Sequence, residues 1–131
     1  MPILVNRAKM TTATTGTGTI TLGAASAGYQ TFADAGVTDG QVVQYVIEDG
    51  VDWEIGEGTY TATGTLLART TVQTSSNADA AIALSGAAVV FISAVAANIV
   101  QTDSTDTLTN KTLADVLLTG AIGEEVFTIP S

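Results

Sequence analysis

The stretch QVVQYVIEDGVDWEIGEGTYTATGTLLARTTV, residues 41–72, carries the clearest structural pattern in the chain. Its first part alternates at period two, with Val43, Tyr45 and Ile47 on one face and Val42, Gln44 and Val46 on the other. Such alternation is typical of a β-strand. A second alternating run follows at residues 51–55, directly after Asp49-Gly50, a pair that favours a tight hairpin turn. The stretch therefore predicts two antiparallel strands joined by a short loop.

Further strands are expected on both sides of this hairpin. Residues 59–64 read as a third short strand, and residues 65–73 read as a fourth across Gly64. Upstream, residues 19–22 alternate polar and apolar side chains, and downstream residues 89–92 form a β-branched and aromatic run. Several short strands with glycine turns predict an all-β fold, a small antiparallel β-sandwich or barrel.

The composition agrees with one β-rich domain. The chain has 131 residues, 46% of them hydrophobic but only 5% aromatic, and 13 are glycine. This length is sufficient for a single hydrophobic core but too short for two full domains. Glycine at frequent intervals supplies turns that need a positive φ.

Charge and residue types exclude several classes of function. The formal net charge of −9 disfavours binding to nucleic acid or to anionic lipid, since both need Lys and Arg. The chain has no cysteine and no histidine, which removes disulfides, thiolate metal sites and the commonest general base. The longest apolar run, residues 80–100, is interrupted by Ser85-Gly86, so no membrane insertion is expected.

The sequence suggests three parts. Residues 1–10 form an N-terminal arm, residues 11–100 the β-domain, and residues 101–131 a linker, oligomerisation or docking segment. The last part is polar, and its spacing fits one helical turn that Thr112 could cap, so an extended, partly helical C-terminal arm is expected. Its sparse apolar side chains are Leu108, Leu113, Val116 and Leu117.

Trp53 is the only tryptophan, and acidic residues flank it on both sides. Catalytic carboxylates, a sugar-binding platform and a cation site were the alternatives to an ordinary hairpin. Because side chains alternate along a strand, we expect Asp52 and Glu54 on a solvated face and Trp53 in the core with its i±2 neighbours. The short acidic loops elsewhere lack the spacing of an EF-hand. We therefore predict no catalytic, cofactor-binding or metal site, and a protein that is not an enzyme.

Arg69 is the only basic residue between Lys9 and Lys111. It is expected to pair with Glu54 or Glu57 across the hairpin, which makes its role structural.

Two stretches resemble bacteriophage virion proteins. Residues 28–32, GYQTF, are followed by WEIGEGTY at 53–60 and LARTTV at 67–72. This combination is similar to a module of tail-fibre and tail-appendage proteins, often found near their N-terminus. TDTLTNKTL, residues 105–113, resembles the linker that precedes the shaft or distal domain in many phage fibre proteins.

The resemblance implies a non-enzymatic structural part of a phage virion, assembled in the bacterial host cytoplasm. The expected role is a tail-fibre or tail-appendage attachment domain, with a capsid decoration or head-fibre protein as the alternative and a carbohydrate-binding module less favoured. Expected partners are other virion proteins and further copies of the chain, with a trimer favoured. The residues expected in partner contacts are Ile3, Leu4, Arg7, Leu108, Leu113, Val116 and Leu117. The residues expected to form a structural hairpin are Trp53, Gly56, Gly58, Tyr60 and Arg69.

Overall fold

The computed structural model describes residues 2–96 and residue 99. The chain divides into two units between Ile99 and Val100. The expected C-terminal arm, with Leu108, Leu113, Val116 and Leu117, lies outside the described residues. The account below concerns the N-terminal unit.

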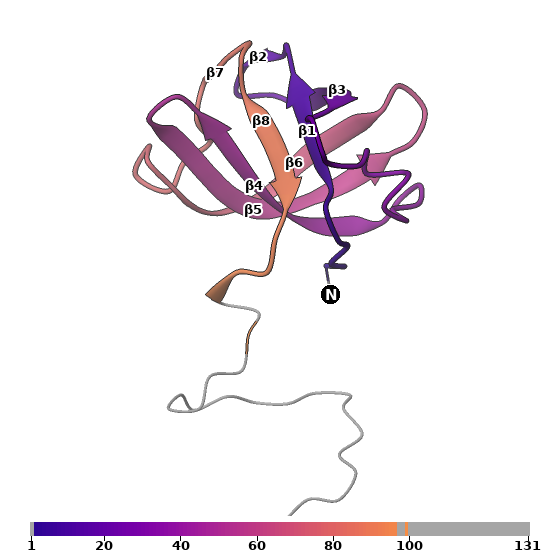
Figure 1. Ribbon diagram of the computed structural model, residues 1–131. Coiled ribbons are helices and arrows are strands. Elements are labelled where there is room, and N and C mark those ends of the chain that lie inside the picture. The colour runs from indigo at the N-terminus through magenta and orange to yellow at the C-terminus, as the bar shows by residue number, and fades with distance from the viewer. Residues whose placement is uncertain (1, 97–98, 100–131) are drawn as a thin grey trace, which may run out of the picture. The chain divides into compact units, whose positions relative to one another are not determined.

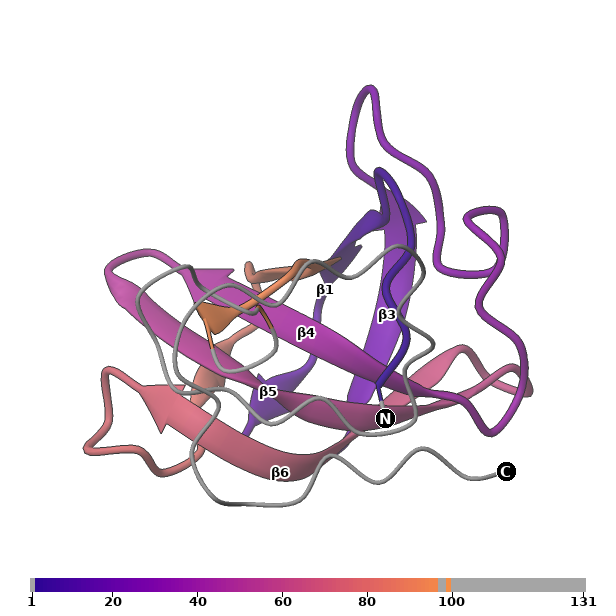
Figure 2. The same cartoon turned by 90° about the horizontal axis from the view of Figure 1, so that it is seen from below.

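The described unit is an antiparallel β-barrel (Figure 1). Six strands close on themselves in the order β1-β3-β6-β5-β4-β8, and Figure 2 shows them from below, around a shared interior. The barrel strands are β1 (Lys9–Thr12), β3 (Ile20–Ala25), β4 (Val42–Asp49), β5 (Asp52–Thr61), β6 (Leu66–Ser75) and β8 (Val89–Ile92). The short strands β2 (Thr15–Gly16) and β7 (Leu84–Ser85) pair with each other, at the top of Figure 1.

The expected all-β fold is confirmed. Of the two architectures expected, a β-sandwich or a β-barrel, the structure has the barrel. One boundary differs from expectation, because residues 52–61 form a single strand that runs through Gly56 and Gly58. The neighbouring strand β6 accommodates this long strand with two irregularities of register, at which Thr70 and Gln73 are skipped in the β5–β6 ladder. Such bulges bend and twist a strand, as closure of a small barrel requires.

The barrel also begins earlier than the expected domain start. Strand β1 starts at Lys9, within the stretch expected as an N-terminal arm, and Ala8 and Met10 are buried in the core. Further upstream, Ile3 forms an isolated bridge with Val43 and packs partly against the core.

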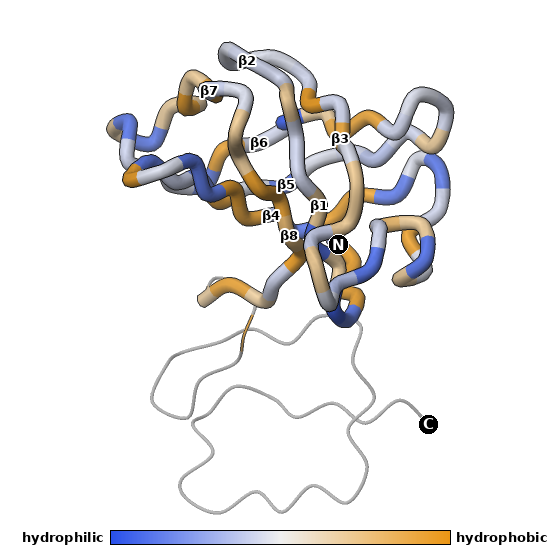
Figure 3. Tube along the Cα trace, turned by 45° about the horizontal axis from the view of Figure 1, so that its top comes forward, coloured by the Kyte–Doolittle hydropathy of each residue, from blue (hydrophilic) through white to orange (hydrophobic). Residues whose placement is uncertain are grey.

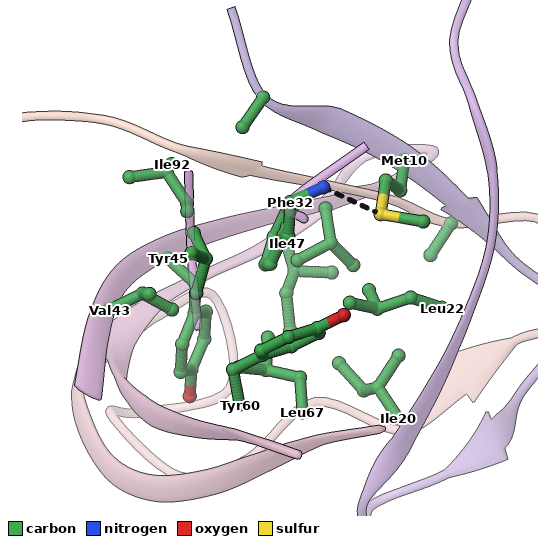
Figure 4. Packing of buried hydrophobic residues seen from close by; sticks show 14 of the residues in the cluster. Met10, Ile20, Leu22, Phe32, Val43, Tyr45, Ile47, Tyr60, Leu67 and Ile92 are labelled. Carbon is green, nitrogen blue, oxygen red and sulfur yellow. Dashed lines mark hydrogen bonds between the residues drawn. The ribbon is translucent and has the colours of Figure 1, made fainter. Parts of the chain in front are cut away.

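The interior is filled by the inward side chains of all six strands and of the loop before β4 (Figure 4). Phe32, from that loop, lies against Tyr60 with ring centroids 6.1 Å apart, and its backbone N–H points to the sulfur of Met10 at 3.3 Å. The largest hydrophobic runs lie on β4 and β8 (Figure 3). The predicted face of Val43, Tyr45 and Ile47 is confirmed, since all three are fully buried.

Candidate functional site

The two faces of β5 are the reverse of those expected from the sequence. Glu54 is completely buried, whereas the side of the strand that bears Trp53 faces outward and Trp53 is 39% exposed. The prediction that Trp53 lies in the core and Glu54 in solvent is therefore wrong. The reason is the register of the hairpin, which places Glu54 directly opposite Ile47, and residues directly opposite each other share a face.

Glu54 is the centre of a buried polar cluster that also contains Arg69, Tyr45 and the backbone of Ile82. Its carboxylate forms a salt bridge with the guanidinium of Arg69, whose Nη2 and Nε both donate to it. The hydroxyl of Tyr45 donates to Oε1 at 2.7 Å, and the backbone N–H of Ile82 donates to Oε2 at 2.8 Å. Every buried side-chain polar atom among the described residues has a hydrogen-bond partner.

Arg69 extends this cluster to the segments that lie between the barrel strands. Its Nη2 donates to the carbonyl of Ile82 at 2.8 Å, and its Nη1 lies 3.4 Å from the carbonyl of Gly16 in β2. The ion pair thus ties β5 and β6 to the segment before β7 and to the turn that contains β2. Its contacts are architectural, since each one holds a strand or loop of this chain.

The environment of the cluster keeps its ion pair charged. Burial raises the pKa of the Glu54 carboxyl, but the hydrogen bonds from Arg69, Tyr45 and Ile82 outweigh burial and leave that pKa below its ordinary value. Burial lowers the pKa of Arg69, and its pairing with Glu54 more than restores it. Burial, followed by the hydrogen bond to Glu54, raises the pKa of Tyr45 far above its ordinary value, so Tyr45 remains a neutral donor.

Two glycines make room for this cluster. Tyr45 lies directly opposite Gly56 in the β4–β5 ladder, and a Cβ placed on Gly56 would come within 2.6 Å of the Tyr45 hydroxyl. A Cβ on Gly58 would come within 2.9 Å of a Leu67 methyl and 3.1 Å of the Tyr45 ring. A Cβ at either position would also collide with a backbone carbonyl of β6, of Thr71 or of Ala68, so the glycines of the WEIGEGTY motif are required by close contacts inside the barrel and not by a turn.

The predicted pairing of Arg69 with one of two carboxylates resolves in favour of Glu54, because Glu57 instead accepts from Gln73 at 3.4 Å. Tyr60, Gly56, Gly58 and Arg69 lie inside the barrel, as a structural hairpin requires, but Trp53 does not. The roles of Tyr45 and Ile82 in the cluster were not foreseen. For Tyr45 the signal was the pair of glycines opposite the apolar face of β4, which indicates a close approach of side chains, whereas no local signal pointed to Ile82.

The loop between β4 and β5 presents a second arrangement of acidic and apolar side chains. Val51 is 93% exposed at the turn, and Glu48 lies directly opposite Trp53 on the outer face. The carboxylate of Asp49 accepts hydrogen bonds from the backbone N–H and the hydroxyl of Ser85, both at 2.6 Å. Asp52 accepts from the hydroxyl of Ser76 at 3.0 Å.

The N-terminal residues expected in partner contacts form a third arrangement. Leu4 is 53% exposed, and Arg7 stacks over the ring of Tyr29 at 4.2 Å while its Nη2 donates to the carbonyl of Gly28 at 2.6 Å. The ammonium of Lys9 lies 5.5 Å from the same ring and 5.2 Å from the ring of Phe91. The structure thus places Leu4 and Arg7 at the surface and Ile3 largely against the core.

One further feature of the surface lies outside these three arrangements, within residues 2–96. An open depression of about 280 Å³ lies beside β1 and the start of β8, and no titratable side chain lines it. No group of acidic side chains in the described part of the chain could hold a metal ion. A helix able to cross a membrane is likewise missing from the residues described.

Comparisons with protein families, with curated proteins and with solved structures found no match to this chain.

Proposed function

We propose that this chain is a structural part of a bacteriophage virion, the attachment domain of a tail fibre or tail appendage. The resemblance of its motifs to that module supplies the biological setting. The observation that carries the structural role is the buried Glu54–Arg69 pair, whose carboxylate is fully occupied by hydrogen bonds within the chain. The most distinctive motif residues therefore serve to build the barrel.

Such a closed interior suits a part whose work is attachment. A carboxylate that acts in catalysis needs access to substrate, whereas Glu54 is completely buried and already holds two strands and a loop. The surface is left to carry contacts, and the exposed Leu4 and Arg7 lie on the side expected to face partner proteins.

Virion association tests this proposal directly. Antibodies raised against the purified chain are applied to density-purified phage particles from a host that carries the gene, and the label is located by immunogold electron microscopy. We expect label on the tail or its appendages. Label on the head favours the capsid decoration or head-fibre alternative. Absence of the protein from purified particles, with the chain present in the lysate, would refute a virion role.

Deletion of residues 101–131 tests the attachment segment. Among the described residues, the buried core and all the barrel strands lie within residues 8–92, so we expect the barrel to stay folded without that segment. We expect virion incorporation to be lost while the circular-dichroism spectrum remains that of a β-protein. Normal incorporation of the folded, truncated chain would contradict the expected role of these residues.

One observation favours a second candidate, a carbohydrate-binding module. Trp53 is 39% exposed, beside the carboxylates of Asp52 and Glu48, and an exposed indole with adjacent acceptors suits a sugar ring. Glycan-array binding that disappears with Trp53→Ala, in a protein that keeps its melting temperature, would support this function over attachment. If the wild-type chain binds no glycan, the carbohydrate-binding function is excluded.

A further inference from the structure

The turn between β4 and β5 carries exposed apolar side chains that the backbone geometry of the turn does not require. Gly50 has a φ of 66° and Val51 does not share this positive φ, so the glycine alone meets the demand of the tight turn. Val51 is nevertheless a β-branched residue that is 93% exposed, and the partly exposed Trp53 follows it. Neither side chain contributes to the buried core.

Carboxylates lie next to these apolar side chains along the hairpin, Glu48 directly opposite Trp53 on the outer face and the paired Asp49 and Asp52 beside the turn. We call Glu48, Asp49, Val51, Asp52 and Trp53 the tip patch. Arg69 lies inside the barrel in its pair with Glu54, so it does not offset these charges at the surface. The tip patch is therefore acidic with an apolar centre, which complements a surface that combines basic and aromatic groups.

Hydrogen bonds to neighbouring segments hold the tip patch in place. Ser85 is anchored by Asp49, and the hydroxyl of Ser76 donates to Asp52. The backbone of Trp53 also bonds to Ser76 in both directions, accepting from its N–H at 3.0 Å and donating to its hydroxyl at 3.1 Å. A surface that is already ordered loses little conformational entropy on binding, which favours a specific contact.

The same barrel carries a surface of the complementary kind. We call Leu4, Arg7, Lys9 and Tyr29 the basic patch. Arg7 and Lys9 both lie over the Tyr29 ring, and Leu4 adds an exposed apolar side chain. The side chain of Arg7 is held by its hydrogen bond to the carbonyl of Gly28. The backbone of Arg7 has a φ of 59°, a conformation that a non-glycine residue adopts only when its surroundings impose it. The guanidinium still has donors to offer, because it makes a single hydrogen bond to the residues described.

The two patches lie toward opposite ends of the barrel strands, and strand β8 separates β1, which carries Lys9, from β4, which carries Glu48. The N-terminal segment joins β4 at its beginning, where Ile3 bridges Val43, whereas the tip patch lies where β4 ends. Figure 1 and Figure 2 show the β4–β5 loop and the N-terminus on different sides of the barrel, with the strands between them. A contact that joins Arg7 and Tyr29 to the tip of the β4–β5 loop therefore involves a second molecule.

We propose that the tip patch of one copy docks onto the basic patch of a second copy of this chain. Glu48 and Asp52 meet Arg7 and Lys9, while Val51 and Trp53 cover Tyr29 and Leu4. The chain has a formal net charge of −9, so copies repel each other at long range and only this local complementarity favours the contact. The proposal goes beyond attachment to a virion and stands on surface chemistry alone, so its failure leaves the proposed function intact.

Charge reversal and mixing test the contact in the full chain. Sedimentation velocity measures the weight-average mass of wild type, Glu48→Lys and Arg7→Glu over a range of concentrations. We expect each variant to weaken association about tenfold, which corresponds to ~1.4 kcal/mol. An equimolar mixture of the two variants should regain mass, because each reversed side chain then finds an opposite charge on the other variant.

Matched controls separate the contact from overall charge. Thr61 ends β5 and Thr63 lies in the loop that follows; both are exposed, and neither belongs to a patch. Changing both to Lys alters the net charge as Glu48→Lys does, and changing both to Glu matches Arg7→Glu. These controls should behave like wild type. Lys9→Glu replaces Arg7→Glu if the latter alters the circular-dichroism spectrum.

Three results would overturn the proposal. The wild type and the folded variants could share one mass at every concentration, the mixture could fail to regain mass, or the threonine controls could weaken association as much as the patch variants do. Any of these means that the copies do not meet through the tip and basic patches.

Discussion

The inner and outer faces of β5 differ in what they require of their residues. On the inner face, contacts within the barrel determine which residues fit at Glu54, Gly56 and Gly58, and almost no other residue type would fit there. On the outer face, Trp53 is partly exposed and makes no contribution to the buried core. One strand therefore carries residues that the fold needs next to residues that the fold leaves free, and the difference can be tested by substitution.

The largest effect is expected for Gly56→Ala. The added methyl group would lie within 2.6 Å of the Tyr45 hydroxyl and closer still to the carbonyl of Thr71, so backbone as well as side chain must shift. We expect the free energy of unfolding to fall by more than about 4 kcal/mol, a large part of the stability of a small domain. Urea unfolding followed by tryptophan fluorescence measures it.

Gly18→Ala is the control for this prediction. A Cβ at Gly18 meets no atom within 4 Å, and its φ is not in the left-handed region. The substitution should change stability by less than about 0.5 kcal/mol. Equal effects at Gly18 and Gly56 would show that the inner face is not crowded as described.

The next effect is expected for Arg69→Met, which leaves a buried carboxylate without its cation. Breaking a buried ion pair from one side typically costs about 3–5 kcal/mol. The double variant Glu54→Gln/Arg69→Met removes the charge as well and keeps an oxygen acceptor for the Ile82 N–H, while the glutamine amide can donate to the Tyr45 hydroxyl. We expect it to be more stable than Arg69→Met alone in the same urea titration. If the double variant is less stable than Arg69→Met, the loss in the single variant does not come from an uncompensated charge on Glu54.

Acid should remove the contribution of this ion pair. The pKa of Glu54 is lowered from 4.5 in the folded protein, so the unfolded chain takes up a proton first as the pH falls. The stabilisation is fully present above pH 4.5 and is lost as the pH falls through the folded pKa. Unfolding free energies of wild type and Glu54→Gln should therefore differ at pH 7 and converge in acid. A constant difference down to pH 2 would argue against a charged Glu54 in the folded state.

The smallest effect on stability is expected for Trp53→Ser. An exposed position away from the core should change the unfolding free energy by no more than about 0.5 kcal/mol. The same substitution should weaken self-association about tenfold in sedimentation, since an exposed tryptophan often dominates an interface. Tyr60→Ser, on the inner face of the same strand, should instead lower the unfolding free energy by about 3 kcal/mol, since it truncates a buried aromatic side chain. Comparable losses of stability at both positions would remove the distinction between the faces.

Much of the fold was predictable from local pattern, whereas the position of Glu54 inside the barrel depends on the register of the hairpin. Alternation identified the strands around Val43 and Trp53, because period two is visible in any short window. It does not say which face is inside. The Asp-Gly turn fixes the pairing of Tyr45 with Gly56 and of Ile47 with Glu54. Since the Val43, Tyr45 and Ile47 face is strongly apolar, this register alone would have placed Glu54 inside.

Other features could not be derived from the sequence. The backbone N–H of Ile82 reaches Glu54 from 28 residues away, and no local pattern indicates where a loop returns to the barrel. The closure between β1 and β8 likewise joins the two ends of the described unit. Such long-range contacts depend on how all the strands pack together, whereas turns and alternation depend on near neighbours.

Closure of the barrel has a consequence for how the protein chooses its partners. The pairing of β1 with β8 leaves the six-stranded sheet without a free edge, so another chain cannot join that sheet by adding a strand. Backbone hydrogen bonding, which accepts almost any sequence, is therefore not available there for recognition. Specificity must be encoded in exposed side chains, and a few surface substitutions can change it while the barrel stays the same.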